Sequence, residues 1–229
     1  MHGNLGGLDL TGVDVAFFAG DVAPLRGLNQ WDKYRQVEWA REEFVPWCAK
    51  WPETKIVFVP GNHDFFPIEG RASGVKDGVD MSLGLGGAPN LTMLVDQAAE
   101  LEFPDGRKLS VYGTPWVPII NHRWAFEAYS DVLKAKFAGI PEGLDVLLTH
   151  APPRFDYFDV SLEYGTDSER FGSEALTQAI LDKRPKMCFC GHIHSGSHIG
   201  GVIGETRVWN VSRVNESYEV AYDPLELEI

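Results

Sequence analysis

The sequence predicts an α/β fold in which short buried strands alternate with helices, and two observations predict it. Four short apolar runs lead directly into polar, glycine-containing sequence, as strands do when both faces of their sheet are covered. Stretches with apolar residues at helical spacing lie between those runs. The chain has 229 residues, of which 44% are hydrophobic and 23% charged, so we expect one globular domain over residues 1–229.

The apolar runs give the order of the predicted strands along the chain. The four runs that end at polar segments cover residues 13–19, 56–59, 146–148 and 187–190. Further strands are predicted at residues 91–95, 109–112 and 207–211. A Pro-Asp-Gly sequence predicts a hairpin turn at residues 102–107, and the glycine-rich residues 199–206 predict a loop or hairpin turn.

Three stretches predict helices. Residues 31–50 carry aromatic and apolar side chains near helical spacing with charges between them, and residues 123–137 predict a second helix. Residues 173–183 predict a third, because Ser173 suits its N-cap and Pro185 follows its end. The glycine-rich residues 70–89 hold few large apolar side chains and predict a mobile loop.

The formal net charge of −13 limits the ligands that the surface attracts. A long polyanion such as DNA would be repelled, so we expect no long nucleic acid as a partner. No apolar run reaches the ~18 residues of a membrane helix, and no cationic and then apolar N-terminal segment predicts a secretory signal. We therefore expect a cytoplasmic protein without a membrane partner.

The chain has three cysteines, Cys48, Cys188 and Cys190. Cys188 and Cys190 alternate with Phe189 in a predicted strand, so their side chains share a face. We expect small buried side chains in a reducing cytosol. A Cys-X-Cys metal or redox pair is the alternative.

Candidate metal ligands stand where the apolar runs end. Ligands bind at the carboxyl ends of strands in open α/β sheets, so side chains that follow four such strands are expected to converge. The segments are Gly20-Asp21, Gly61-Asn62-His63-Asp64, Thr149-His150 and Gly191-His192-Ile193-His194, preceded by His2. Alone, Asp21 is explained by an N-cap, Asn62 by a turn and His150 by an ordinary loop histidine. Their order along the chain favours a metal site.

These residue types suit a site with two metal ions. Two divalent ions ~3.5–4 Å apart clamp a phosphoryl centre and lower the pKa of a water between them. Asp21 is the candidate bridge, because a carboxylate has two oxygens and a negative charge, and Asn62 offers a neutral amide oxygen. Imidazole ligands suited to Mn, Fe or Zn are offered by His2, His150, His192 and His194.

With these motifs the chain resembles the calcineurin-like metallophosphoesterase superfamily. The pattern of that superfamily is Asp-X-His, Gly-Asp, Gly-Asn-His-Asp/Glu, His and Gly-His-X-His, and the resemblance covers essentially the whole chain. It implies an αββα sandwich of two mixed sheets with a dinuclear metal site at its edge. A narrower group is also similar, the metallophosphoesterase-domain proteins of mammalian brain and bacterial relatives, which include Mn-dependent phosphodiesterases that accept cyclic nucleotides. That likeness lies in residues 112–116, 140–145, 149–153 and 184–186.

The resemblance also implies a role for each candidate residue. The first metal ion would be held by His2, Asp21 and His194. The second would be held by Asp21, Asn62, His150 and His192. His63 would lie beside the phosphate as general acid or transition-state stabiliser, with Asp64 positioning it. A hydroxide activated by the two ions, manganese in the first instance with iron or zinc as alternatives, would be the nucleophile, so no covalent intermediate is implied.

One part of the superfamily pattern falls outside these residues. The pattern places an Asp two residues before the first His, and that position would precede Met1. We therefore expect the sandwich to lack its first strand and the first ion to be held less tightly. Either the start is assigned too late or the chain is truncated. In both cases we expect the second site, with its four ligands, to fill preferentially.

The predicted function is metal-dependent hydrolysis of a small phosphodiester, with cyclic nucleotides among the candidate substrates. Two alternatives stay open: a phosphomonoesterase or nucleotidase of the same fold, and a catalytically weak metal- or nucleotide-binding module. A nuclease is disfavoured, because the sequence shows no basic groove or extra domain. Phe65, Phe66 and Trp116 are candidates for a base or aryl pocket, although packing is the more common role of aromatic side chains.

Overall fold

The computed structural model describes residues 1–25, 31–66, 88–161, 170–196, 198 and 200–228. Within these residues the strands form two main sheets and a two-stranded ribbon. The predicted mobile loop at residues 70–89 lies, up to residue 87, outside the described residues. Among the described helices, none combines the length and the apolar content that a membrane span requires.

The two main sheets differ in size and in strand direction. The smaller sheet is parallel and consists, in order, of β1 (Val15–Phe18), β2 (Lys55–Phe58) and β3 (Leu91–Met93). The larger sheet is mixed and consists, in order, of β10 (Gly200–Ile203), β11 (Thr206–Asn210), β9 (Met187–Cys190), β8 (Val146–Thr149), β5 (Lys108–Thr114) and β4 (Gln97–Glu102). The ribbon pairs β6 (Val117–Pro118) with β7 (Glu127–Ala128).

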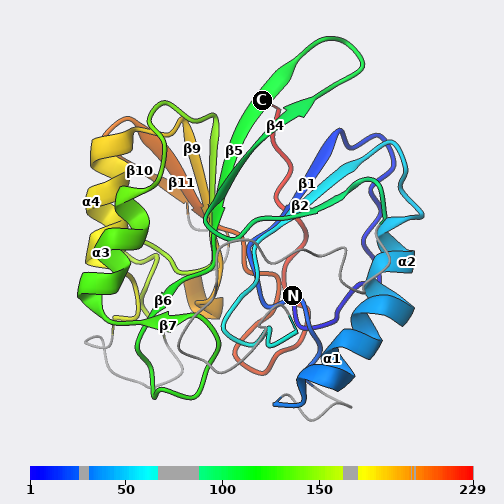
Figure 1. Ribbon diagram of the computed structural model, residues 1–229, viewed down its shortest axis with the longest axis horizontal. Helices are drawn as coiled ribbons and strands as arrows, with labels where there is room; N and C mark the ends of the chain where they lie inside the picture. Colours follow the sequence, from blue (N-terminus) through cyan, green and yellow to red (C-terminus); the bar gives the residue numbers. More distant parts are fainter. Residues whose placement is uncertain (26–30, 67–87, 162–169, 197, 199, 229) are drawn as a thin grey trace.

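Helices cover the outer face of each sheet (Figure 1). Beside the smaller sheet runs a helix made of α1 (Lys33–Trp39), the π-helical turn η1 (Ala40–Phe44) and α2 (Val45–Cys48). The Asp32 side chain caps this helix by accepting hydrogen bonds from two backbone N–H groups. The helix lies within residues 31–50, where the sequence predicts one. The larger sheet is covered by α3 (Ser130–Ala138) and α4 (Glu174–Lys183), and a short 3-10 helix, η2 (His194–Gly196), follows β9.

Three apolar layers hold this sandwich together. One lies between the smaller sheet and its helix, where Phe44 and Phe58 pack edge to face. A second lies between the larger sheet and its two helices. The third lies between the sheets, where Val57, Val111 and Leu148 are fully buried. Helix, sheet, sheet and helix are therefore the successive layers, which confirms the predicted α/β fold with two sheets.

The strand ends that carry the candidate ligands meet at one edge. The parallel register sets Phe18 at the end of β1 beside Phe58 at the end of β2, and β8 is parallel to β9 in the other sheet. Between the sheets, ring Nδ1 of His150 donates a hydrogen bond to the Ala19 carbonyl at 2.7 Å. The segments that follow these four strands are thereby brought together, as the sequence predicts.

The helix predicted over residues 123–137 is wrong in its first half, since α3 begins only at Ser130. The Glu127 carboxylate accepts hydrogen bonds from four backbone N–H groups, those of Ile120, Asn121, His122 and Trp124. His122 and Phe126 also have positive φ values of 63° and 56°. These residues form a carboxylate-centred loop, because Glu127 satisfies the backbone donors that a helix would otherwise use.

Two strands of the larger sheet lie where the sequence did not predict them. β4 has a mostly polar, exposed sequence at a sheet edge, and its inward positions are marked only by Ala99 and Leu101. The glycine-rich residues 199–206, predicted as a loop or hairpin turn, contain β10 and the turn that joins it to β11. Gly204 in that turn has a φ of 60°, and the predicted hairpin turn is confirmed. Most of the segment predicted as loop or turn is, however, the strand β10.

The three cysteines are free thiols in buried positions, which confirms the expected packing role. Burial raises the pKa of Cys188 to about 12, so the thiol stays protonated at neutral pH. Sγ of Cys190 donates a hydrogen bond to the Trp209 carbonyl.

Candidate metal centre

Asp21 lies at the centre of the candidate site, directly after β1. Its Oδ2 lies 3.6 Å from Nε2 of His2 and 3.4 Å from Nε2 of His150, and its Oδ1 accepts the backbone N–H of His63 at 2.9 Å. Ligand atoms of Asp21, His150 and His192 all lie within 4.8 Å of one another, close enough to share one ion. Burial alone would raise the pKa of Asp21, but the surrounding histidines hold it well below its usual value, so the carboxylate is charged.

His150 shows why a cation fits at this position. Its Nδ1 faces the Ala19 carbonyl and must carry a proton, while its Nε2 lies 2.9 Å from Oδ1 of Asn62 and also faces Asp21. Burial would lower the pKa of His150, but Asp21 raises it, because the Nε2 atom facing two oxygens needs a proton of its own. A metal ion in place of that proton would satisfy the lone pairs of all three side chains.

The other three imidazoles are held in the neutral form. Burial lowers the pKa of His192 to about 3, that of His194 to about 4 and that of His2 well below its usual value. Nδ1 of His194 donates to the Asn215 carbonyl at 3.0 Å, which leaves Nε2 as the ligand atom. Both ring nitrogens of His2 are buried and have no hydrogen-bond partner within the described residues. Neutral imidazoles with available nitrogens are what a metal ion requires.

The six predicted ligands thus lie together in two overlapping groups. The rings of His150 and His192 are 5.0 Å apart, the rings of His2 and His194 are 5.4 Å apart, and Oδ2 of Asp21 faces one member of each pair. The mixture of carboxylate, amide and imidazole donors fits Mn, Fe or Zn. The complete set is His2, Asp21, Asn62, His150, His192 and His194.

The backbone at this site adopts conformations that ordinary residues rarely use. His2, Asp21 and His192 have positive φ values of 53°, 51° and 68°. Such strain concentrates at functional sites. A side chain at Gly20 would overlap the His150 ring, and one at Gly61 would overlap the Asp21 carboxylate. The two glycines are therefore needed for the close approach of the ligand-bearing turns.

His63 lies beside the candidate ligands, and Asp64, the next residue in the chain, is buried. The His63 ring is 5.0 Å from the His2 ring, burial lowers its pKa, and its Nδ1 has no hydrogen-bond partner in the part of the chain that the structure describes. Asp64 is fully buried and accepts hydrogen bonds from the backbone N–H groups of Val22, Ala23 and Gly61. These contacts join the turn after β1 to the turn after β2, which carries His63.

Three further residues contact the site without belonging to its sequence motifs. Gln36, buried in α1, donates from Nε2 to the His63 carbonyl at 2.8 Å. Asn215 supplies the carbonyl that accepts from His194, and the Tyr218 ring, whose residue has a φ of 61°, lies 4.9 Å from the His2 ring. A glutamine on the buried face of a helix is a readable signal, whereas no local pattern marks Asn215 or Tyr218.

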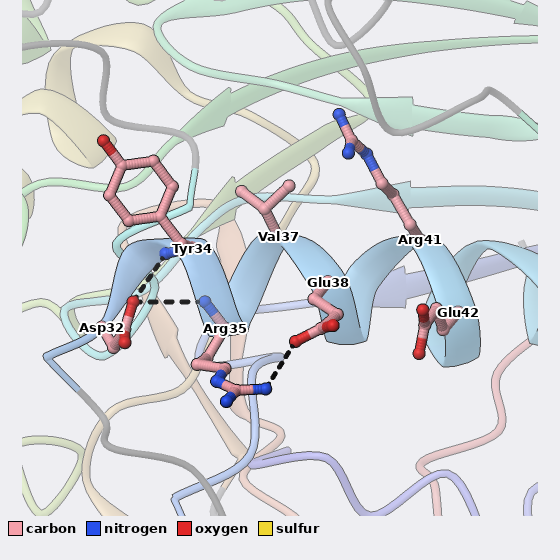
Figure 2. A pocket seen from close by; sticks show the side chains of 7 residues that line it. All are labelled: Asp32, Tyr34, Arg35, Val37, Glu38, Arg41 and Glu42. Atoms are coloured by element: carbon pink, nitrogen blue, oxygen red, sulfur yellow. Dashed lines mark hydrogen bonds and ion pairs between the residues drawn. The ribbon is translucent and has the colours of Figure 1, made fainter.

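A hollow on the outside of α1 is separate from the metal centre. Figure 2 shows the side chains that line it, Asp32, Tyr34, Arg35, Val37, Glu38, Arg41 and Glu42. Arg35 and Glu38 form an exposed ion pair there at 2.9 Å. No predicted ligand lines this hollow, so it has no part in the metal centre.

The fold and the site define a two-sheet α/β protein with a candidate metal centre at its strand ends. A family model for calcineurin-like phosphoesterases matches residues 6–196. The chain belongs to the calcineurin-like phosphoesterase family, which confirms the resemblance in its motifs.

The relatives that the chain resembles are longer than it is. The chain is 33% identical over 123 residues to a UPF0046 protein of Caenorhabditis elegans, a match that covers 53% of this chain and 29% of that protein. It is 25% identical over 230 residues to metallophosphoesterase domain-containing protein 1 of Homo sapiens, with 94% of this chain and 64% of that protein covered. The chain therefore spans less than two thirds of either relative.

A solved structure with little sequence likeness shares the fold. The crystal structure of TT1561 from Thermus thermophilus superimposes with a TM-score of 0.54 at 15% identity, over 87% of this chain and 77% of that one.

Proposed function

We propose that this chain is a metal-dependent phosphoesterase that hydrolyses small phosphodiesters, cyclic nucleotides included. The observation that carries the proposal is the convergence of Asp21, His150 and His192, whose ligand atoms all lie within 4.8 Å of one another. Oδ1 of Asn62 joins them at 2.9 Å from Nε2 of His150. Family membership supports phosphoester hydrolysis as the reaction. The likeness to metallophosphoesterase domain-containing protein 1 supports the same class of reaction, and the preference for diesters is the finer part of the proposal.

Two divalent ions are the cofactor we propose, with manganese as the first candidate. His2, Asp21 and His194 would hold one ion, and Asp21, Asn62, His150 and His192 would hold the other. When bound, such ions polarise the phosphoryl group and make a water more acidic. Two observations support this role. Among the described residues, the buried ring nitrogens of His2 have no hydrogen-bond partner. Nε2 of His150 faces oxygens of both Asn62 and Asp21.

The residues of the chain supply orientation and proton handling. Asp21 holds the His63 backbone through Oδ1, and Asp64 holds the turns on both sides. His63 is thereby fixed beside the ligands, where its ring stabilises charge on a phosphoryl oxygen or gives a proton to the leaving oxygen. Burial of Asp21 and His150 excludes water from their lone pairs, which strengthens every charge interaction at the site.

The ligand and compartment belong to the same proposal. A small phosphate ester suits a protein of net charge −13 better than a long nucleic acid does. Three free, buried thiols support a reducing compartment, the cytoplasm.

Paired substrates test the diester preference. Purified protein is assayed with bis(p-nitrophenyl) phosphate and with p-nitrophenyl phosphate at equal Mn concentration. We expect kcat/KM to be higher for the diester. A higher value for the monoester, from the same preparation, would replace this proposal with a phosphomonoesterase.

A further inference from the structure

A run of aromatic rings leads from the metal centre to the surface. The ring centroids of His63 and Trp124 are 4.2 Å apart, and those of Trp124 and Trp31 are 4.6 Å apart with planes inclined by 30°. Phe65 lies 5.4 Å from Trp31, which is 44% exposed. Trp31, Trp124 and Phe65 are absent from the three apolar layers formed by the described residues. These rings therefore need an explanation other than core packing.

The loop that carries Trp124 is fixed to the metal centre. The backbone N–H of Ala125 donates to the carbonyl of the ligand Asn62 at 3.0 Å. The backbone N–H of Trp124 donates to the Glu127 carboxylate at 3.0 Å, as do three neighbouring N–H groups. The position of Trp124 relative to the ligands is thus set by the protein before any substrate arrives, which reduces the cost of binding.

We propose that the exposed ring of Trp31, packed on Trp124, forms an aromatic platform on which the nucleobase of a phosphate ester stacks while its phosphate lies beside His63. The inference rests on the proposed function, because it uses the same phosphate position. Any of the nucleobases can stack on an aromatic side chain, because every base has a flat π face.

Charge and reach both fit this class of ligand. The guanidinium of Arg123 lies 5.9 Å from the Trp31 ring centroid and places a cation at the platform of an otherwise acidic protein. The ring centroids of His63, Trp124 and Trp31 follow one another in steps of 4.2 and 4.6 Å. From a phosphate beside His63, the nucleoside of a bound nucleotide would extend along these rings toward Trp31.

Two ligands that differ only in the base test the platform. AMP and ribose 5-phosphate are titrated calorimetrically into the Mn-loaded protein. We expect AMP to bind about 5- to 100-fold more tightly than ribose 5-phosphate. In Trp31→Ala this ratio should fall toward one while the affinity for ribose 5-phosphate is unchanged, and Trp31→Phe should restore part of the ratio.

Tyr34→Ala is the matched control, because it removes another exposed aromatic ring near the start of the same helix and should keep the wild-type ratio. Equal affinities for AMP and ribose 5-phosphate in the wild type would overturn the platform, as would an unchanged ratio in folded Trp31→Ala. Failure of the proposed function shows itself separately, as absence of Mn-dependent hydrolysis of bis(p-nitrophenyl) phosphate.

Discussion

The candidate metal centre depends on single side chains whose ligand atoms lie close together, within 4.8 Å for Asp21, His150 and His192. The order of Asp21, Asn62, His150 and His192 along the sequence was enough to predict that they converge, because each follows an apolar strand. Tyr218 could not be predicted, since its contact with His2 comes from a turn distant in sequence and depends on a positive φ. Residues within a motif are readable from sequence, whereas residues that only tertiary folding brings near are not.

Asp21→Asn tests the central ligand. The substitution keeps the side-chain shape but removes the charge that faces both His2 and His150. We expect Mn affinity and kcat/KM to fall by more than the ~10–100-fold that loss of an outer contact costs. Asp9→Asn, at an exposed carboxylate that bonds only to Thr11 in the described structure, should leave both quantities unchanged. Calorimetric Mn titration and diester hydrolysis provide the two readouts.

Gly61→Ala tests the close approach of two turns. The added methyl group would overlap the Asp21 carboxylate, so we expect the turns to separate, Mn affinity to drop and the free energy of unfolding to fall by about 1–3 kcal/mol. Thermal unfolding and Mn titration measure both effects. Gly6→Ala is the control, because a methyl group there meets no atom within 4 Å. Unchanged Mn affinity in Gly61→Ala would show that the approach of these turns is not needed for the site.

At the scale of elements, the turn at residues 215–219 holds His194, one of the three residues proposed to bind the first metal ion. The Asn215 side chain accepts the backbone N–H groups of Ser217 and Glu219, at 3.0 Å each, and its carbonyl holds His194. Asn215→Ala should loosen this turn and weaken Mn binding roughly 10-fold. Asn121→Ala, which removes a similar exposed turn contact to Arg123, is the matched control. If both variants bind Mn like the wild type, the turn does not orient His194.

The elements themselves were predicted best where a single physical signal dominated. The apolar runs gave β1, β2, β8 and β9 because strands covered on both faces have no competing pattern. The helix predicted over residues 123–137 failed at its start because the Glu127 carboxylate organises the backbone into a loop, and carboxylate contacts leave no periodic trace. β4 was not predicted because an edge strand can be largely polar.

At the scale of the whole molecule, the buried histidines make the metal-free protein sensitive to acid. In the folded protein the pKa of His192 is about 3 and that of His194 is about 4, both below the ordinary 6.5. Between those values and pH 6.5, the unfolded chain therefore binds more protons than the folded protein does. Their contribution to stability is complete above pH 6.5 and is lost as the pH falls through 4 and 3. For His194 alone, the loss by pH 4 is on the order of 3 kcal/mol.

Denaturant unfolding of the chelated protein at several pH values measures this dependence. His194→Gln should lose less stability than the wild type between pH 6.5 and 4, whereas His122→Gln, at an exposed position, should follow the wild type. Asp64 has the opposite pH dependence, because burial raises its pKa to about 6. Its contribution to the free energy of unfolding is complete below pH 3.8 and is lost as the pH rises through 6. An identical pH slope in His194→Gln would contradict the burial of a neutral imidazole.

The most direct test of the account is hydrolysis of bis(p-nitrophenyl) phosphate by the chelated protein as Mn is returned, with Asp21→Asn measured in parallel. We expect turnover to be absent after chelation, to rise with Mn to a plateau in the wild type, and to stay near background in the variant. A folded wild-type protein without turnover at millimolar Mn would contradict it, as would turnover in Asp21→Asn equal to that of the wild type.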